Sequence, residues 1–112
     1  MRPIPGAREQ LDHAKAELIL HLVTMELISA TNHNGAFHNA HEGWAVLYEE
    51  VDELWEEVRE KYPDEAKQLK EAIQCAAMSV RFVHDLIDET TLDAYREEKA
   101  PHYVSQLGGS RG

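Results

Sequence analysis

The feature that most constrains the fold is a long apolar repeat in the middle of the chain. Between about Ala40 and Tyr62, apolar residues recur at intervals of three and four, and the repeat comprises Trp44, Leu47, Tyr48, Val51, Leu54, Trp55, Val58 and Tyr62. This spacing places the side chains along one side of an α-helix and does not match the alternation of a β-strand. Asn39 is a suitable N-cap, with Glu42 three residues later, and Pro63 suits the first turn of a following helix.

Helical spacing also marks the segments on either side. The segment from about Arg8 to Thr31 has no proline or glycine, and its apolar stripe is Leu11, Ala14, Leu18, Leu22, Met25 and Ser29, widened by Ile19, Val23 and Leu27. A third helix is predicted from about Pro63 to Ile87, with the stripe Leu69, Ala72, Ile73, Ala76, Ala77, Val80, Val83, Leu86 and Ile87. The turn residues 32–35 predict a loop that runs to about Asn39.

These elements predict an all-α protein with one domain over residues 1–112. We expect an antiparallel helical bundle of three long helices plus a short C-terminal helix around Thr91–Lys99, with flexible ends at residues 1–7 and 101–112. The apolar stripes are too wide for three helices to cover. We therefore expect oligomerisation to complete the bundle, as a homodimer or homotetramer.

The charge balance limits the partners of this protein. The chain carries 21 acidic and 11 basic side chains, for a net charge of −10. Such a surface repels nucleic-acid polymers and anionic membranes and attracts cations. A single cysteine, Cys75, excludes an intrachain disulfide and favours a reducing, cytoplasmic setting. No apolar run is long enough to span a membrane, and no signal peptide is recognisable, so we expect a soluble, intracellular protein.

Acidic residues flank the apolar stripe of the middle helix. Glu50, Glu53 and Glu57 follow one another at helical spacing, and Glu49 lies beside them. Like charges at this spacing repel by roughly 0.2–0.5 kcal/mol per pair. A hard cation such as Mg²⁺ would relieve the repulsion, whereas the simpler interpretation is a solvated helix face.

The third helix offers a matching pair, since Glu71 and Gln74 share a face. If the two helices pack antiparallel across the short connection, Glu53 and Glu71 lie at similar heights, each about nine residues from the turn. The spacing therefore predicts a shared site of Glu50, Glu53, Glu71 and Gln74.

These residues carry a resemblance to a known family. Glu49-Glu50-x-x-Glu53, a gap of 17 residues and then Glu71-x-x-Gln74 resemble the EExxE…ExxD pattern of the MazG-like all-α nucleotide pyrophosphohydrolases. Residues 37–58 and 71–86 are also similar to small MazG-like proteins of phages and bacteria. The resemblance covers roughly residues 10–90.

The resemblance implies a helical bundle that dimerises or forms dimers of dimers and binds Mg²⁺ or Mn²⁺. It also implies hydrolysis of a nucleoside triphosphate between the α and β phosphates, giving the monophosphate and pyrophosphate. By position, Glu50, Glu53 and Glu71 would be metal ligands and Glu49 a supporting acid or water-activating base. Gln74 departs from the pattern, because its carbonyl can bind a cation but carries no charge, which weakens metal binding.

Three further residues are candidates for contacts to the substrate: His38, Trp44 and Arg81. Each also has a structural interpretation. His38, like His33 and His41, can cap the middle helix, Trp44 can belong to the core or an interface, and Arg81 can form a structural ion pair. A separate row, His13, Glu17 and His21, has a spacing that can bind a transition metal, although an exposed helix face explains it equally well.

Metal-dependent (d)NTP hydrolysis is therefore the function that the sequence favours. No P-loop and no Ser–His or Cys–His nucleophile pair is recognisable. Two alternatives stay open: a non-catalytic helical oligomer with a weak metal or nucleotide site, favoured by Gln74, and an acidic adaptor that binds a basic protein.

Overall fold

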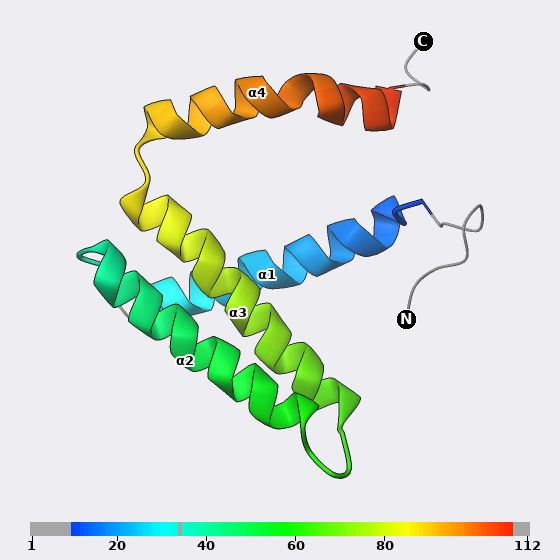
Figure 1. Ribbon diagram of the computed structural model, residues 1–112, viewed down its shortest axis with the longest axis vertical. Helices are drawn as coiled ribbons and strands as arrows, with labels where there is room; N and C mark the ends of the chain where they lie inside the picture. Colours follow the sequence, from blue (N-terminus) through cyan, green and yellow to red (C-terminus); the bar gives the residue numbers. More distant parts are fainter. Residues whose placement is uncertain (1–9, 34, 109–112) are drawn as a thin grey trace.

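The computed structural model describes residues 10–33 and 35–108, and side chains in residues 10–33 and 35–100. Across these residues the structure contains helices and no strand, as the sequence predicts. The helices are α1 (His13–His33), α2 (Ala40–Val58), α3 (Glu65–Leu86) and α4 (Glu89–Gly108), shown in Figure 1.

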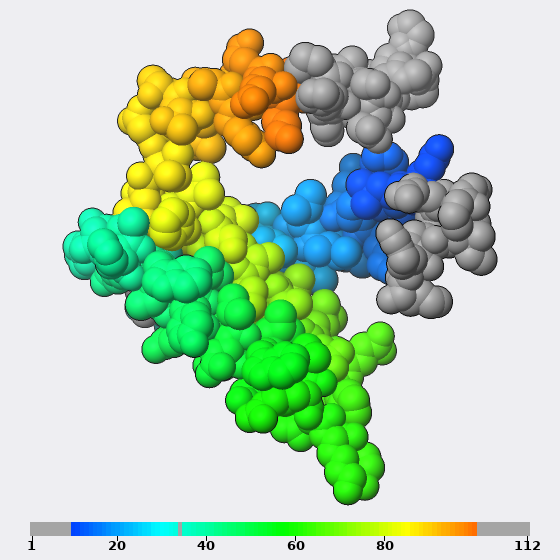
Figure 2. Space-filling model, viewed as in Figure 1, coloured from blue at the N-terminus to red at the C-terminus, as the bar shows by residue number. Residues whose placement is uncertain are grey.

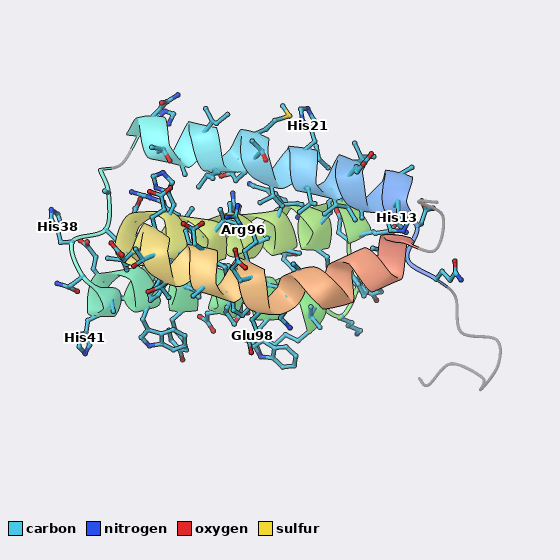
Figure 3. The ribbon with its side chains drawn as sticks, turned by 90° about the horizontal axis from the view of Figure 1, so that it is seen from above. His13, His21, His38, His41, Arg96 and Glu98 are labelled. Atoms are coloured by element: carbon cyan, nitrogen blue, oxygen red, sulfur yellow. The ribbon has the colours of Figure 1, made fainter. Side chains whose placement is uncertain are left out.

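Helix α3 is the centre of the arrangement. It packs against α2 on one side and against α1 on the other, whereas no Cα atom of α1 comes within 8 Å of a Cα atom of α2 (Figures 1 and 3). Helices α2 and α3 form an antiparallel hairpin, joined by residues 59–64. Among the described residues, α4 contacts none of the other three helices. The packing is bundle-like for α1, α2 and α3 and leaves α4 outside.

The buried core lies where α1 and the 35–38 segment meet α3. Its buried apolar members are Val23, Phe37, Ala77 and Met78. Partly buried residues from three helices pack around them: Leu27, Ala30, Val46, Leu47, Ile73, Ala76, Phe82 and Leu86. Ala77 is fully buried, and its small side chain allows the helices to approach closely.

The start of α2 agrees with the predicted cap, in part. Asn39 adopts an extended conformation, and its side-chain oxygen accepts a hydrogen bond from the backbone N–H of Glu42 at 2.8 Å. The Glu42 carboxylate does not return to Asn39 as a capping box requires. It accepts from the backbone N–H of His38 at 2.6 Å instead.

The hairpin between α2 and α3 is longer than predicted. Helix α2 ends at Val58 and not at Tyr62, and the N–H of the C-cap residue Arg59 donates to the Trp55 carbonyl at 3.0 Å. Helix α3 begins at Glu65 and not at Pro63, because Asp64 is the residue that caps it. The Asp64 carboxylate accepts from the backbone N–H groups of the next turn, at 2.9 and 3.3 Å.

The first and last helices also differ from the prediction. Residues 10–12 are not helical, and α1 starts only after Asp12, whose carboxylate accepts from the Lys15 N–H at 3.0 Å. Helix α4 spans 20 residues, so it is long where a short helix was expected. It continues through Pro101, although a proline lacks the N–H for one bond of the helix. Flexible ends were predicted at residues 1–7 and 101–112; residues 101–108 are instead the last part of α4, so the prediction is wrong there, and residues 1–7 and 109–112 lie outside the described residues.

Candidate functional site

Three carboxylates from two helices meet at one place on the α2–α3 hairpin. Glu50 and Glu53 lie on α2, Glu71 lies on α3, and one ligand oxygen of each lies within 4.8 Å of the others. The antiparallel hairpin produces this meeting, because residues equally far from its turn lie side by side. Within the described residues, no other group of three His, Cys, Asp or Glu side chains, including the His13–Glu17–His21 row, comes this close.

Gln74 completes the set of four that the sequence predicts. When its amide nitrogen faces the carboxylates, it donates to Oε1 of Glu50 at 3.0 Å and to Oε1 of Glu71 at 3.3 Å. The opposite orientation of the amide directs its carbonyl oxygen at the same two carboxylates. Oxygens that face one another repel unless a cation or a proton lies between them, so the preferred orientation of Gln74 depends on whether a cation is bound and on whether Glu50 or Glu71 is protonated.

Two carboxyl groups of the cluster, those of Glu50 and Glu71, ionise with difficulty. Burial raises the pKa of the Glu50 carboxyl above its usual 4.5, and negative charges raise it further: those of Glu53, Glu71, Glu49 and Glu26. Burial also raises the pKa of Glu71, together with the charge of Glu53 and a hydrogen bond to it. Both shifts reflect a shortage of positive charge, which a bound cation would supply.

Glu50 of the cluster, together with Gln74, also lines a cavity that involves α1. This cavity has a volume of about 420 Å³ and is lined by Glu26, Ser29, Ala30 and His33 of α1, Val46 and Glu50 of α2, and Gln74 and Met78 of α3. The α1 residues were not predicted as part of the site. The sequence holds no clear signal for them, since Glu26 and His33 are two of several polar residues on this helix.

Glu49 lies beside the cluster on the exposed side of α2. It contributes no ligand atom to the group of three, and its negative charge acts on Glu50 from the next position along the helix. Its location suits a group that faces solvent at the edge of the site.

The three predicted substrate contacts lie apart from this cavity. His38 is exposed, and its ring nitrogen lies 3.1 Å from Glu42 Oε1. Trp44 is 57% exposed and lines a different groove, between α2 and α3. Arg81 is buried, with 3% exposure. Neither His38, Trp44 nor Arg81 is among the residues that line the cavity at the carboxylates.

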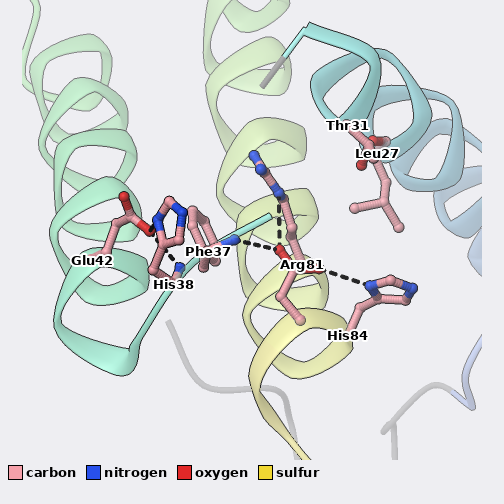
Figure 4. A network of polar contacts seen from close by, with 8 residues as sticks. Leu27, Thr31, Phe37, His38, Glu42, Arg81 and His84 are labelled. Carbon is pink, nitrogen blue, oxygen red and sulfur yellow. Dashed lines mark hydrogen bonds and ion pairs between the residues drawn. The ribbon is translucent and has the colours of Figure 1, made fainter. Parts of the chain in front are cut away.

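Arg81 belongs to a polar network that holds the loop before α2 (Figure 4). Its Nε lies 3.3 Å from Asp85 Oδ2, and the same oxygen accepts the backbone N–H of Phe37 at 2.9 Å. The Arg81 guanidinium also lies over the Phe37 ring, 4.5 Å from its centroid. The structural ion pair, which was one of two interpretations of Arg81, is thus present, and the role of Asp85 was not predicted.

The fold and the cluster define an all-helical protein with a paired-carboxylate site on a helical hairpin. No protein-family model, curated protein or solved structure matches the chain. Within the described residues, no helix has the length and apolar character needed to cross a membrane.

Proposed function

We propose that this chain is a Mg²⁺- or Mn²⁺-dependent pyrophosphohydrolase that cleaves a (d)NTP between its α and β phosphates, releasing (d)NMP and pyrophosphate. The proposal is supported by one observation above all: the carboxylates of Glu50, Glu53 and Glu71 converge to within 4.8 Å. A protein with a net charge of −10 repels a triphosphate. Cations at the carboxylate cluster would offset that repulsion where the substrate binds.

The donor atoms suit a hard divalent cation. Mg²⁺ binds oxygens at about 2.0–2.1 Å, so two oxygens on opposite sides of the ion are about 4.2 Å apart. Because the Glu53 side chain is exposed, it can rotate and bring its carboxylate oxygen to that distance from the oxygens of Glu50 and Glu71. Gln74 would add a neutral fourth oxygen after its amide turns.

Each residue of the site has a role in this proposal. Glu50, Glu53 and Glu71 hold the cation, which when bound lowers the pKa of water and offsets charge on the phosphate oxygens. Glu49, at the solvent edge of the cluster, accepts the proton of the attacking water. The cavity between α1 and α2 receives part of the nucleotide next to the carboxylates. We further propose that the chain functions as a homo-oligomer.

A second function is favoured by Gln74. Its amide nitrogen can donate to Glu50 and Glu71 and so link two carboxylates without any metal. The cluster would then be a structural feature of a non-catalytic helical oligomer. This candidate predicts no turnover, together with a protein whose stability depends little on Mg²⁺.

The proposal is tested with a panel of canonical and modified (d)NTPs, with Mg²⁺ or Mn²⁺ and released pyrophosphate as the readout. We expect turnover of at least one (d)NTP, and a loss of about 100-fold or more in Glu71→Gln, because another charge at the cation is removed. Glu60→Gln, the same change outside the cluster, should retain activity and serves as the matched control.

Two results would contradict the proposal in different ways. A wild-type protein that is inert across the panel, and that gains activity in Gln74→Asp, would support the non-catalytic alternative. Activity that survives Glu71→Gln unchanged would exclude the cluster as the active site.

A further inference from the structure

The cavity beside the carboxylate cluster has a polar wall, which α1 supplies. Glu26, Ser29 and His33 line the cavity and are three and four residues apart in the sequence, so they share one face of the helix. The cavity volume of about 420 Å³ lies within the roughly 300–1,000 Å³ that is common for small-molecule sites. The group of three carboxylates takes no ligand atom from this wall. The polar wall can therefore contact a different part of the substrate.

The rest of the cavity lining suits a flat ring. Ala30, Val46 and Met78 contribute apolar side chains from α1, α2 and α3. Met78 is buried, and the thioether of a methionine makes favourable contacts with aromatic rings. Sites of this kind hold a ligand between apolar walls and orient it through a small number of polar groups. An aromatic ring in this cavity would be oriented by the polar wall of α1.

The cavity adjoins the carboxylate cluster. Glu50 belongs to the cluster and also lines the cavity, and Gln74, whose amide nitrogen can donate to Glu50 at 3.0 Å, lines the cavity too. Burial and the neighbouring carboxylates of α2 and α3 raise the pKa of Glu50, and the charge of Glu26 raises it further, so Glu26 lies close enough to interact with the cluster. A nucleotide with its phosphates at the cluster can therefore place its base in the cavity.

The polar wall offers mainly hydrogen-bond acceptors. Glu26 is half-buried, and its carboxylate makes no hydrogen bond or ion pair with any residue that the structure describes. A carboxylate accepts through both oxygens and can bind two parallel N–H groups. The ring Nδ1 of His33 donates to the Ser29 carbonyl oxygen at 2.8 Å, which leaves Nε2 as an acceptor in the neutral ring. The Ser29 hydroxyl, one turn from Glu26, can donate.

We propose that the polar wall selects guanine, with the Glu26 carboxylate accepting the N1–H and 2-amino groups of the base; this inference rests on the nucleotide substrate of the proposed function. Guanine is the common base that presents two N–H donors side by side, with O6 next to them for the Ser29 hydroxyl. Adenine and cytosine present a donor beside an acceptor, and thymine and uracil place one N–H between two carbonyl oxygens. With any of these bases, one Glu26 oxygen would face a lone pair.

The wild type alone tests the preference for guanine. With Mg²⁺, the kcat/KM for dGTP should exceed that for dATP, dCTP and TTP by about 10-fold or more, because a wrong base leaves a carboxylate oxygen without its donor. dITP, which differs from dGTP only in lacking the 2-amino group, should lose a similar factor. Calorimetric titration with dGMP, dIMP and dAMP should give the same order of affinity and requires no turnover.

Glu26→Gln should shift the preference from guanine to adenine. A glutamine amide presents one donor and one acceptor, which is the pair that matches adenine. The kcat/KM for dGTP should fall by about 10-fold or more and that for dATP should rise. The increase of Tm in Mg²⁺ should remain, because Glu26 is outside the group of three carboxylates. Glu17→Gln, the same change on the exposed part of α1 outside the cavity, is the matched control and should keep the wild-type preference.

Three outcomes would overturn the inference. These are a wild type that does not prefer guanine in binding, a guanine preference that survives Glu26→Gln, and a Glu26→Gln variant without a Mg²⁺ response, which would make Glu26 a cation ligand. Failure of the proposed function gives a different result. A wild type that hydrolyses no (d)NTP, but binds dGMP more tightly than dIMP and dAMP through Glu26, would support the base site and exclude the hydrolase.

Discussion

Glu50 shows how a single residue connects the packing of the hairpin to the chemistry of its site. It is half-buried on α2, faces Gln74 of α3, and lines the cavity that α1 closes. Burial and four neighbouring carboxylates all disfavour its ionised form. Such convergence of negative charge reduces the stability of the folded state unless a proton or a cation offsets it.

The cluster should make the stability of the metal-free protein fall as pH rises. The folded-state pKa values of Glu50 and Glu71 are raised, so their contribution to stability is fully present below about pH 4.5 and is lost as pH rises through the raised values. Mg²⁺ should restore stability at neutral pH, by about 2.7 kcal/mol at a concentration 100 times its Kd. Thermal unfolding with and without Mg²⁺ measures both effects.

Glu50→Gln tests whether the carboxylate cluster causes both the pH dependence of stability and the response to Mg²⁺. The variant should lose most of the Mg²⁺ response and should have a flatter dependence of Tm on pH, because one of the repelling charges is absent. Glu60→Gln should behave as the wild type. An unchanged Mg²⁺ response in both Glu50→Gln and Glu53→Gln would place the cation elsewhere on the molecule.

Asp85 stabilises the fold through its buried partners. Burial favours its neutral form, but hydrogen bonds from His84 and from the Phe37 N–H, together with the charge of Arg81, lower its pKa below the usual 3.8. Asp85→Asn would remove the carboxylate charge that lies 3.3 Å from the buried Arg81 Nε and should reduce the free energy of unfolding by about 3 kcal/mol. The loss should disappear at a pH below the lowered pKa, where the wild-type carboxyl is also neutral.

Urea denaturation measures this loss, and a second ion pair provides the control. Asp93 and Arg96 pair on α4 with side chains that are 57% and 75% exposed, so Asp93→Asn should change stability by less than about 1 kcal/mol. Equal effects of the two substitutions would show that the Asp85 network does not stabilise the loop before α2.

At the scale of the elements, the closest approach of α2 and α3 depends on Gly43. A Cβ atom at this position would lie 2.7 Å from Cδ2 of Phe82 and 3.2 Å from atoms of Phe37 and Leu86. The absence of a side chain therefore allows the first turn of α2 to contact α3 directly.

Gly43→Ala should destabilise the protein although alanine is the better helix former. The gain in helix propensity of about 1 kcal/mol is opposed by overpacking against the Phe82 ring, which costs about 1–3 kcal/mol. Gly35→Ala is the control, because no atom lies within 4 Å of a Cβ at that position. Chemical denaturation should show a loss for Gly43→Ala only, and a stabilised Gly43→Ala would mean that the helices can separate freely.

At the scale of the whole molecule, the chain is more extended than a closed domain of its length. The radius of gyration of its Cα atoms is 17.0 Å, against about 13 Å for a compact domain of about 100 residues. The separation of α4 accounts for part of this difference, and Figure 2 shows open space between α4 and α1.

The sequence by itself determined the helices and the pairing of two of them. The apolar repeat, the Asn39 cap and the short connection predicted at Tyr62–Pro63 are local signals, and local signals specify helices and antiparallel neighbours. For the same reason the meeting of Glu53 with Glu71 followed from counting residues away from the turn. The exact helix ends did not follow, because Asp12 and Asp64 compete with nearby residues as caps.

Only the tertiary structure decided which faces are covered and which remain open. A helical stripe shows that a face is apolar but not which neighbour packs on it, because that depends on contacts between residues far apart in the chain. Thus Trp44 and Trp55 are 57% and 55% exposed although the stripe alone allowed them to be core residues. Likewise, α1 contributes Glu26 and His33 to the cavity beside Glu50, since α3 packs against both α1 and α2.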